Sequence, residues 1–273
     1  MSMKKNIAII LLTSLVTLSL FTACVRERDT DIEIVKEEVL GKMLFDNAIS
    51  IVDDAATKSS GELLANYKMA GYCANIIHDT VSIPRKIEID FGIENCLCND
   101  GRNRRGKIIA EYTGDKYADT NNSTLIQFEN YYLDDMFVAG TIFIGNKGHN
   151  LVGQKYFEIE TEGKFVKQVG EDTVYWNANR TRTWIQGQDT PIWGDDIYKL
   201  EGSGNGRNGN KQYYAMNITD PLIRDLTCRY ITKGTIEMQP QGKTLRSLDY
   251  GDGSCDKSAT VIVDKKAFHI ELH

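Results

Sequence analysis

The sequence has little proline and no excess of positive charge. Only four of its 273 residues are proline, which argues against a long proline-rich linker. The formal net charge of −6 gives no electrostatic reason to bind nucleic acid, because such binding rewards clusters of Lys and Arg that release counterions from phosphate. The densest basic stretch, from Arg102 to Lys107, is short and is expected to be a solvated hairpin loop. No nucleic-acid partner is therefore expected.

Motifs for catalysis and for cofactors are also missing. Gly-x-Ser-x-Gly, the nucleophile elbow of many hydrolases, does not occur. The glycine-rich stretch 202–209 lacks the strand–glycine–helix context of a phosphate-binding loop and is expected to be a flexible turn. Neighbouring aspartates such as Asp134-Asp135 do not have EF-hand spacing and are expected to form turns. We assign no catalytic residue, and no metal or cofactor is expected.

Histidine is scarce as well. No two histidines have the spacing of a helical zinc site, and His-Glu-x-x-His is absent. Each histidine is therefore expected at the surface or in a turn; the four are His78, His149, His269 and His273.

The amino-terminal residues have the pattern of an export signal. Lys4 and Lys5 precede an uncharged stretch from Ile7 to Phe21, which has the length of a signal-peptide core and falls short of the ~20 residues that a membrane span needs. It ends in Phe21-Thr22-Ala23-Cys24, and a small residue before a cysteine is typical of the site that lipoprotein signal peptidase cuts. The sequence predicts a signal peptide over 1–23 and a hydrophilic tether over 24–33.

Cys24 would then become the first residue and carry fatty acids such as palmitate. Two or three acyl chains hold a protein stably on a membrane, so a lipid anchor in the cell envelope, at the outer membrane, is expected. The alternative is an ordinary secretory signal with an incidental cysteine.

The rest of the chain predicts one helix followed by many strands. From Ile34 to Ala56 the apolar residues recur at helical spacing, which indicates an amphipathic helix that covers one face of a sheet. From Tyr72 onward the period is two. Turn signals separate the alternating runs, among them Gly145–Gly148, Glu162-Gly163, Gly202–Gly206, Gln241-Gly242 and Gly251–Gly253. We therefore predict a mainly β fold, a single domain over 34–273 built as a large antiparallel meander: an open curved sheet, a sandwich or a half-barrel.

A cysteine pattern occurs twice in this region. Cys73 is followed by Cys96, and Cys228 by Cys255, and the same kind of triplet stands six residues before each second cysteine: Asp90-Phe91-Gly92 and Asp249-Tyr250-Gly251. We expect two related units, around 72–114 and 228–273 on either side of a central meander, each closed by its own disulfide, which an exported compartment permits. Cys98 is left over, and the alternative is that it replaces Cys96 as the partner of Cys73.

Two stretches resemble a family of Bacteroidota lipoproteins. The first consists of Ile89-Asp90-Phe91-Gly92 with Cys96, Asp100-Gly101-Arg102, Gly106-Lys107-Ile108-Ile109 and Tyr112-Thr113-Gly114. The second is Leu248–Asp256 with Ala259-Thr260-Val261. The likeness covers most of the chain from about residue 70 to the end, and Cys98 departs from the family pattern. The family is uncharacterised, so the resemblance implies a β-rich lipoprotein and no activity.

Aromatic residues gather in the middle of the chain and form a candidate ligand platform: Trp176, Trp184, Trp193 and Tyr198. Trp and Tyr on a sheet face can stack on sugar rings or anchor a protein partner, whereas in the alternative interpretation they are core residues of strands. The sequence thus favours a membrane-anchored envelope lipoprotein with a binding or structural role and a glycan or protein ligand. The alternative is a hydrolase of glycan or peptide, whose two carboxylates the sequence does not pair.

Overall fold

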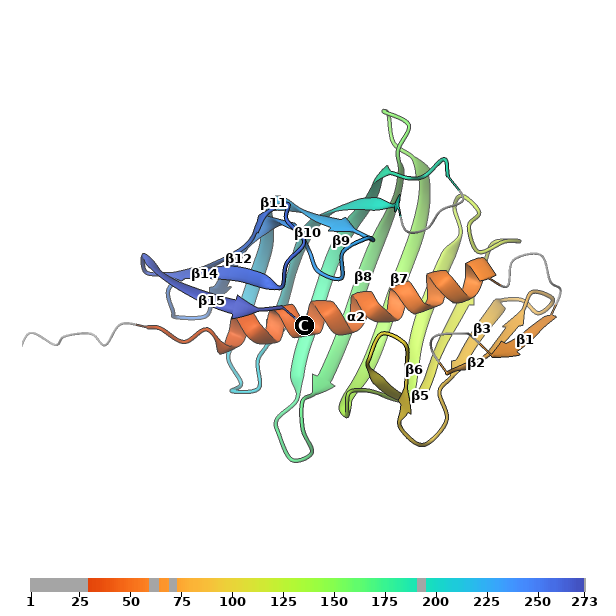
Figure 1. Ribbon diagram of the computed structural model, residues 1–273, viewed down its shortest axis with the longest axis horizontal. Coiled ribbons are helices and arrows are strands. Elements are labelled where there is room, and N and C mark those ends of the chain that lie inside the picture. Colours follow the sequence, from red (N-terminus) through yellow and green to blue (C-terminus); the bar gives the residue numbers. More distant parts are fainter. Residues whose placement is uncertain (1–28, 59–63, 69–72, 191–194, 273) are drawn as a thin grey trace, which may run out of the picture. The chain divides into compact units, whose positions relative to one another are not determined.

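The computed structural model describes residues 29–58, 64–68, 73–190 and 195–272 (Figure 1). Residues 31–273 form one compact unit, which contains the helix and all the strands described. The predicted lipidation site Cys24 lies outside the described residues, as do Trp193 and His273. Among the residues described, no helix is long and apolar enough to cross a membrane.

Helix α2 (Glu33–Lys58) opens this unit. The carboxylate of Asp31 accepts a hydrogen bond from the backbone N–H of Glu33 (2.9 Å), which satisfies a group that a helix start leaves free. Apolar side chains such as Ile34, Leu44 and Ile51 are completely buried, because the helix crosses the strands on one face of the sheet (Figure 1). The prediction of an amphipathic helix that covers a sheet is confirmed.

A single antiparallel sheet contains all the strands of the described residues. Fourteen strands follow one another across the sheet in sequence order, and β4 pairs with β5 beside this path. The strands are β1 (Leu64–Lys68), β2 (Asn75–Asp79), β3 (Arg85–Asp90), β4 (Cys96–Leu97), β5 (Asn103–Tyr112), β6 (Ser123–Leu133), β7 (Met136–His149), β8 (Lys155–Val166), β9 (Val174–Gln186), β10 (Ile197–Arg207), β11 (Tyr213–Asp225), β12 (Lys233–Pro240), β13 (Arg246–Asp252), β14 (Ser258–Val263) and β15 (Lys266–Glu271).

The sheet is open, with β1 and β15 at its two edges. Figure 1 shows that its carboxyl-terminal strands turn back toward helix α2. The predicted fold class, a mainly β antiparallel meander with one amino-terminal helix, is confirmed, and the open sheet is the form that it takes.

Three glycine stretches that the sequence predicted as turns lie inside strands. Gly145–Gly148 belong to β7, Glu162-Gly163 to β8 and Gly202–Gly206 to β10, so these turn predictions are wrong. Gly163 shows the physical reason: a Cβ built there would lie 2.1 Å from the ring of Phe45. Glycine in this strand allows the helix to approach the sheet closely and does not mark a turn.

The helix and the sheet enclose one continuous core. The ring of Phe45 on the helix stacks on the indole of Trp176 in β9, with ring centroids 5.3 Å apart. Among the residues that the structure describes, the core extends from Ile32 to Leu272.

Both predicted disulfides are present, Cys73–Cys96 and Cys228–Cys255. Each joins the residue ahead of an antiparallel hairpin to the segment that follows it: the hairpin is β2–β3 in the first unit and β12–β13 in the second. Cys98 takes part in neither bridge and is buried.

The repeated triplets also adopt the same local structure. In the first, the carboxylate of Asp90 accepts a hydrogen bond from the N–H of Gly92 (2.8 Å), and in the second Asp249 accepts one from Gly251 (2.9 Å). Both glycines have a positive φ, +84° and +102°, a conformation that favours glycine. The internal repeat in the sequence therefore corresponds to a repeated turn in the structure.

Candidate functional site

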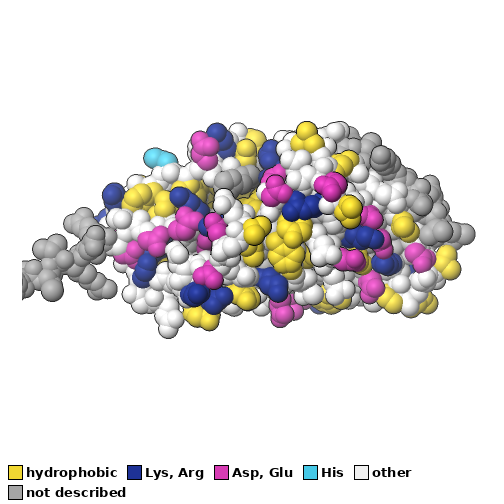
Figure 2. Space-filling view, turned by 90° about the horizontal axis from the view of Figure 1, so that it is seen from below, with side chains coloured by type: hydrophobic (Ala, Val, Ile, Leu, Met, Phe, Trp, Pro, Cys, Tyr) yellow, Lys and Arg dark blue, Asp and Glu magenta, His cyan; other side chains and the backbone are white. Residues whose placement is uncertain are grey.

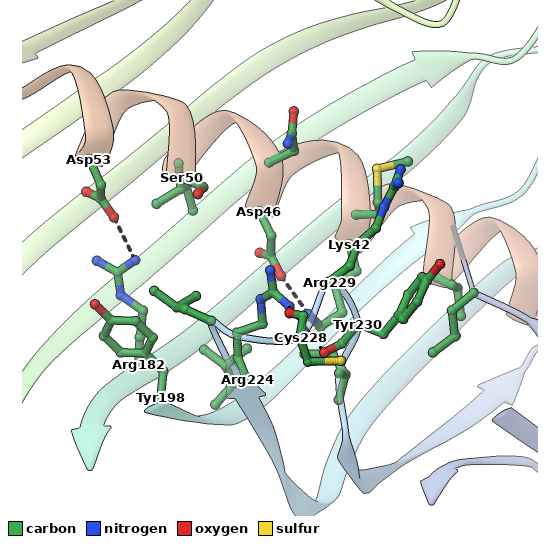
Figure 3. Close-up of a pocket in the computed structure, with 18 of the residues that line it drawn as sticks. Lys42, Asp46, Ser50, Asp53, Arg182, Tyr198, Arg224, Cys228, Arg229 and Tyr230 are labelled. Carbon is green, nitrogen blue, oxygen red and sulfur yellow. Dashed lines mark hydrogen bonds and ion pairs between the residues drawn. The ribbon is translucent and has the colours of Figure 1, made fainter. Parts of the chain in front are cut away.

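A pocket of about 630 Å³ lies between helix α2 and the sheet, a volume in the range of small-molecule sites. Figure 3 shows Lys42, Asp46, Ser50 and Asp53 on the helix side and residues of the strands opposite. Two loops contribute to the lining, one with residues 99–102 and one with residues 226–231. Each disulfide-closed unit therefore supplies one of the loops around the pocket.

The helical residues of the pocket form a polar stripe. Lys42, Asp46, Ser50 and Asp53 are spaced by four, four and three residues, which brings them to one side of a helix. Apolar residues of the same helix pack against the sheet. The stripe thus places charged groups at the boundary between the core and the pocket.

The inner part of the pocket is a buried ion cluster. The carboxylate of Asp46 forms ion pairs with the ammonium of Lys42 (2.6 Å) and with the guanidinium of Arg180 (2.8 Å). Burial alone would raise the pKa of Asp46, but Arg180 and Lys42 outweigh it and hold the pKa below its usual value. Burial is also the main reason that the pKa of Lys42 is lowered, and Arg180 and Arg224 add to the shift.

Arg180 keeps donors that no described residue accepts from. Arg180 is 4 % exposed. Its guanidinium lies over the ring of Trp176, 5.1 Å from the ring centroid. Within the described part of the chain, Nε and Nη1 of Arg180 have no hydrogen-bond partner. The hydroxyl of Tyr250, which also lines the pocket, is likewise buried without a partner among these residues.

Arg224 organises the loop that follows β11. Its Nη1 donates to the backbone carbonyl of Cys228 and to that of Tyr230 (3.2 Å). These acceptors are neutral, so the charge of the guanidinium is not compensated by them. Burial lowers the pKa of Arg224.

Two further arginines come from the two loops. Arg102 is buried and Arg229 is exposed, and both line the pocket. Burial lowers the pKa of Arg102, and the positive charge of Arg229 lowers it further. The two units therefore bring like charges close to each other at this site.

The opposite end of the pocket has a compensated pair. Asp53 accepts hydrogen bonds from the hydroxyl of Tyr117 (2.6 Å) and from Arg182 (3.0 Å). The guanidinium of Arg182 lies 4.7 Å from the ring centroid of Phe157 and 5.1 Å from that of Tyr198. This end is closed by partners within the protein.

The lining as a whole is positively charged. Six basic side chains and three carboxylates line the pocket, although the chain carries a net charge of −6. The third carboxylate, Asp100, is engaged by Arg104 outside the pocket (2.6 Å). In the part of the chain that is described, Arg102, Arg224 and Arg229 form no ion pair with a carboxylate.

The described residues of the predicted aromatic platform do not share one exposed surface. Trp176 is completely buried, and its indole N–H donates to Glu38 (2.8 Å), so it is a core residue. Trp184 is half-buried, with its ring 5.4 Å from that of Tyr198. Tyr198 lines the pocket.

Sequence reasoning missed the arginines of the pocket. The stretch from Arg102 to Lys107 was predicted as a solvated loop, which is wrong for Arg102 and for the completely buried Arg104. In β9 the buried positions 174, 176, 178 and 180 alternate with more exposed ones. The available signal is an arginine in register with the apolar inward positions of β9, as Arg180 is.

The histidine prediction is corrected at one position. His78 is 3 % exposed, and its Nε2 lies 2.7 Å from the hydroxyl of Tyr112. Burial lowers the pKa of His78. His149 and His269 are exposed, as predicted.

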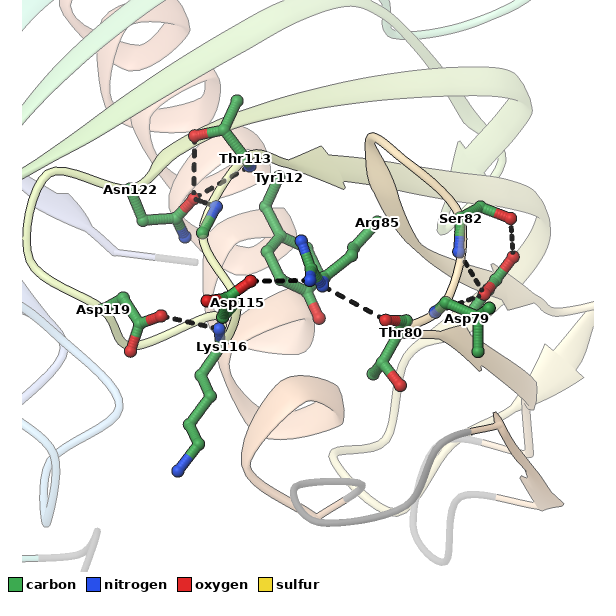
Figure 4. A network of polar contacts seen from close by, with 12 residues as sticks. Asp79, Thr80, Ser82, Arg85, Tyr112, Thr113, Asp115, Lys116, Asp119 and Asn122 are labelled. Atoms are coloured by element: carbon green, nitrogen blue, oxygen red, sulfur yellow. Dashed lines mark hydrogen bonds and ion pairs between the residues drawn. The ribbon is translucent and has the colours of Figure 1, made fainter.

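A second polar cluster joins the loop between β2 and β3 to the loop between β5 and β6 (Figure 4). Arg85 donates to the carbonyl of Thr80 (3.1 Å) and to the carboxylate of Asp115 (2.7 Å). Asn122 accepts a hydrogen bond from the N–H of Thr113 (3.0 Å). These groups satisfy one another, so the cluster has a structural role in holding the loops.

The face of the molecule shown in Figure 2 has no comparable concentration of one charge. Acidic and basic side chains are interspersed on this face. The described residues contain no group of three or more His, Cys, Asp or Glu that could hold a metal ion. Comparisons with known protein families, curated proteins and solved structures find nothing that matches this chain.

Proposed function

We propose that this protein is a lipid-anchored lipoprotein of the cell envelope that binds a small molecule in the pocket beneath helix α2. The observation that carries the proposal is the pocket itself, because a volume of about 630 Å³ with convergent polar groups is typical of a ligand site. The sequence favours a binding role, and we place the binding site in this pocket instead of on the aromatic platform.

The proposed location in the cell envelope is supported by the amino-terminal segment and by the disulfides. The stretch that ends in Ala23-Cys24 has the pattern of a lipoprotein signal. Disulfides persist in oxidising compartments, so the two bridges of the body support export. The resemblance to Bacteroidota lipoproteins agrees with this location, and we place the anchor at the outer membrane.

Binding is favoured over hydrolysis by the carboxylates of the pocket. Asp46 and Asp53 are seven residues apart on the helix, about 10 Å along its axis, whereas the carboxyl pair of a glycosidase is about 5–9 Å apart. These two carboxylates and the third one of the pocket, Asp100, are all engaged by arginines. Burial raises the pKa of Glu38 and of Asp196, as a general acid requires, but neither lines the pocket.

A neutral fluorescent probe tests the proposed binding site. The fragment 25–273 contains the whole compact unit and its core, and expression in an oxidising compartment would form its disulfides. We expect N-phenyl-1-naphthylamine to bind with saturation at one probe per chain. Ser50→Trp and Leu226→Trp each place a large ring in the pocket and should weaken this binding at least tenfold.

Two results would contradict the proposal. One is no saturable binding of the neutral probe by a fragment that shows the circular dichroism and cooperative melting of a folded protein. The other is undiminished binding in both tryptophan variants. The anchor is tested separately: an alkynyl palmitate analogue should label the full chain in its host and should not label Cys24→Ser.

A further inference from the structure

We infer that the pocket binds an amphipathic anion, whose carboxylate or phosphate head is held by the uncompensated basic side chains and whose body contacts the apolar lining. This inference rests on the proposed function and names the class of ligand that the same site takes.

The first argument is the charge imbalance of the lining. Six basic and three acidic side chains line the pocket, and one of the carboxylates, Asp100, already pairs with Arg104. Like charges in a partly buried site repel one another and lose hydration. Burial is the main cause of the lowered pKa values of Lys42, Arg102 and Arg224. For Lys42 and Arg102, the positive charge of a neighbouring basic group lowers the pKa further. A bound anion would relieve both effects.

The second argument is the unused donors of Arg180. This side chain is held in place by Asp46 on one side and by the ring of Trp176 on the other. Its Nε and Nη1 are buried and have no partner among the described residues. A buried guanidinium without a full set of acceptors is costly, and a carboxylate or phosphate accepts from two of its N–H groups at once.

The third argument is the position of the basic groups relative to the two loops. Figure 3 shows Arg224 and Arg229 on the side of the pocket that faces Lys42 and Asp46. The positive charge of Arg229 lowers the pKa of Arg102 although the two residues belong to different disulfide-closed units. A head group at this end would therefore be held by both units, whereas the other end is already closed by Asp53 and Arg182.

The fourth argument is the apolar part of the lining. Ile49 on the helix and Ile159, Leu200 and Leu226 on the sheet side line the same cavity. Apolar surface is stabilised when it leaves water. A small inorganic anion would leave these side chains uncovered, so the geometry favours an anion with an apolar body.

A pair of probes with the same skeleton tests the sign of the charge. 8-Anilinonaphthalene-1-sulfonate carries the N-phenylnaphthylamine skeleton of the neutral probe and adds one sulfonate. We expect the fragment 25–273 to bind the sulfonate at least tenfold more tightly than N-phenyl-1-naphthylamine. We also expect that advantage to decrease as salt is added, because screening weakens partly exposed ionic contacts.

The double variant Arg102→Gln/Arg229→Gln locates the effect. It should weaken sulfonate binding at least tenfold and weaken binding of the neutral probe by a clearly smaller factor. Arg207→Gln is the matched control, since Arg207 lies over the ring of Tyr175 and does not line the pocket; it should leave both affinities within twofold. Arg224 is not substituted, because its loss would also release the carbonyls of its loop.

Competition against the neutral probe identifies the head group. Octanoate, octyl phosphate and octanol share one body and differ in the head. Preferential displacement by octanoate or by octyl phosphate supports the inference and distinguishes a carboxylate ligand from a phosphate ligand. Equal displacement by all three overturns it, as does a parallel loss of both probes in the double variant. In either case binding of the neutral probe would still leave the proposed function standing, so the two failures are distinguishable.

Discussion

The hairpins β2–β3 and β12–β13 are each spanned by a disulfide and each end in an Asp-aromatic-Gly turn, but they differ in the aromatic residue and in the cysteines. Phe91 in the first packs against Tyr131, with centroids 5.9 Å apart. Tyr250 in the second has its hydroxyl buried at the pocket without a partner among the described residues. The same turn thus serves packing in one unit and supplies a polar group to the pocket in the other.

The cysteines differ in the same direction. Cys228 has one disulfide partner, Cys255, and itself lines the pocket. In the first unit the sulfur of Cys98 lies 3.6 Å from that of Cys73, which is already paired with Cys96. In the first unit the sulfurs of both Cys96 and Cys98 therefore lie near Cys73. The described residues of the second unit contain no third cysteine.

The largest effect is expected from removal of the second bridge. Cys228→Ser/Cys255→Ser frees a loop with a sequence separation of 27 and should lower the free energy of unfolding by about 3–4 kcal/mol on the chain-entropy model. For a body of this size the melting temperature should fall by roughly 10 °C. Chemical denaturation and calorimetry of the oxidised protein measure both. A loss below about 1 kcal/mol would show that this bridge does not restrain the unfolded chain as the comparison assumes.

An ion pair in the first unit should give the next largest effect. Asp100→Asn removes the carboxylate from the completely buried Arg104, which keeps a hydrogen bond to Asn47 (3.0 Å). We expect the variant to lose about 2 kcal/mol of unfolding free energy at pH 7.

This loss should depend on pH. Burial alone would raise the pKa of Asp100, but Arg104 outweighs it and lowers the pKa. The carboxylate therefore contributes stability that is fully present above its unfolded pKa of about 4 and disappears as the pH falls through the lowered folded value. Denaturant titrations at pH 7 and below pH 4 should show the two proteins converging at acid pH. A pH-independent difference would be contrary to this explanation.

Exchange of the aromatic residues tests the two environments. Phe91→Tyr adds a hydroxyl to a buried ring and should cost about 1–3 kcal/mol. The matched variant Tyr250→Phe removes a hydroxyl that has no partner among the described residues and should change stability by less than about 0.5 kcal/mol. Equal costs for the two exchanges, measured by denaturation, would mean that the turns have equivalent surroundings.

The smallest effect on stability is expected from loss of Cys96 in the first unit, because Cys98 lies close to Cys73. Cys96→Ser should allow Cys98 to pair with Cys73, so that the free energy of unfolding falls by about 1 kcal/mol or less. Peptide mapping of the oxidised variant should find the Cys73–Cys98 bridge, and Cys73→Ser is the control that removes both pairings. Free thiols at both Cys73 and Cys98 would rule out this substitution of one bridge for the other.

The fold was predictable from local patterns. The helix near residue 45 and the long antiparallel meander follow from periods of 3.6 and of two, and the disulfides follow from the equal offset of the triplets. The turns at Glu162-Gly163 and Gly202–Gly206 were predicted wrongly, because glycine marks both turns and close contacts. In the structure a Cβ at Gly163 would meet the ring of Phe45, and a Cβ at Gly202 would meet the backbone of Asn179.

The site was less accessible to sequence reasoning. Asp53 and Arg182 are separated by 129 residues, and whether they meet depends on the register of the sheet under the helix. Arg102 has acidic and polar neighbours in the sequence, which favour a place at the surface. Its burial arises from contacts with a distant helix: its Nη1 lies 2.6 Å from the sulfur of Met43.

The order of elements along the chain has a consequence for synthesis. Helix α2 comes first, yet its Glu38 accepts a hydrogen bond from the hydroxyl of Tyr214, 176 residues later. The apolar side of the helix packs against strands as distant as β8 and β9, as in the stack of Phe45 on Trp176, and contacts of such long range form slowly. A nascent chain interrupted before β9 would leave this side of the helix incompletely covered, so a chaperone that shields residues 33–58 during translation and transport would protect the protein from aggregation.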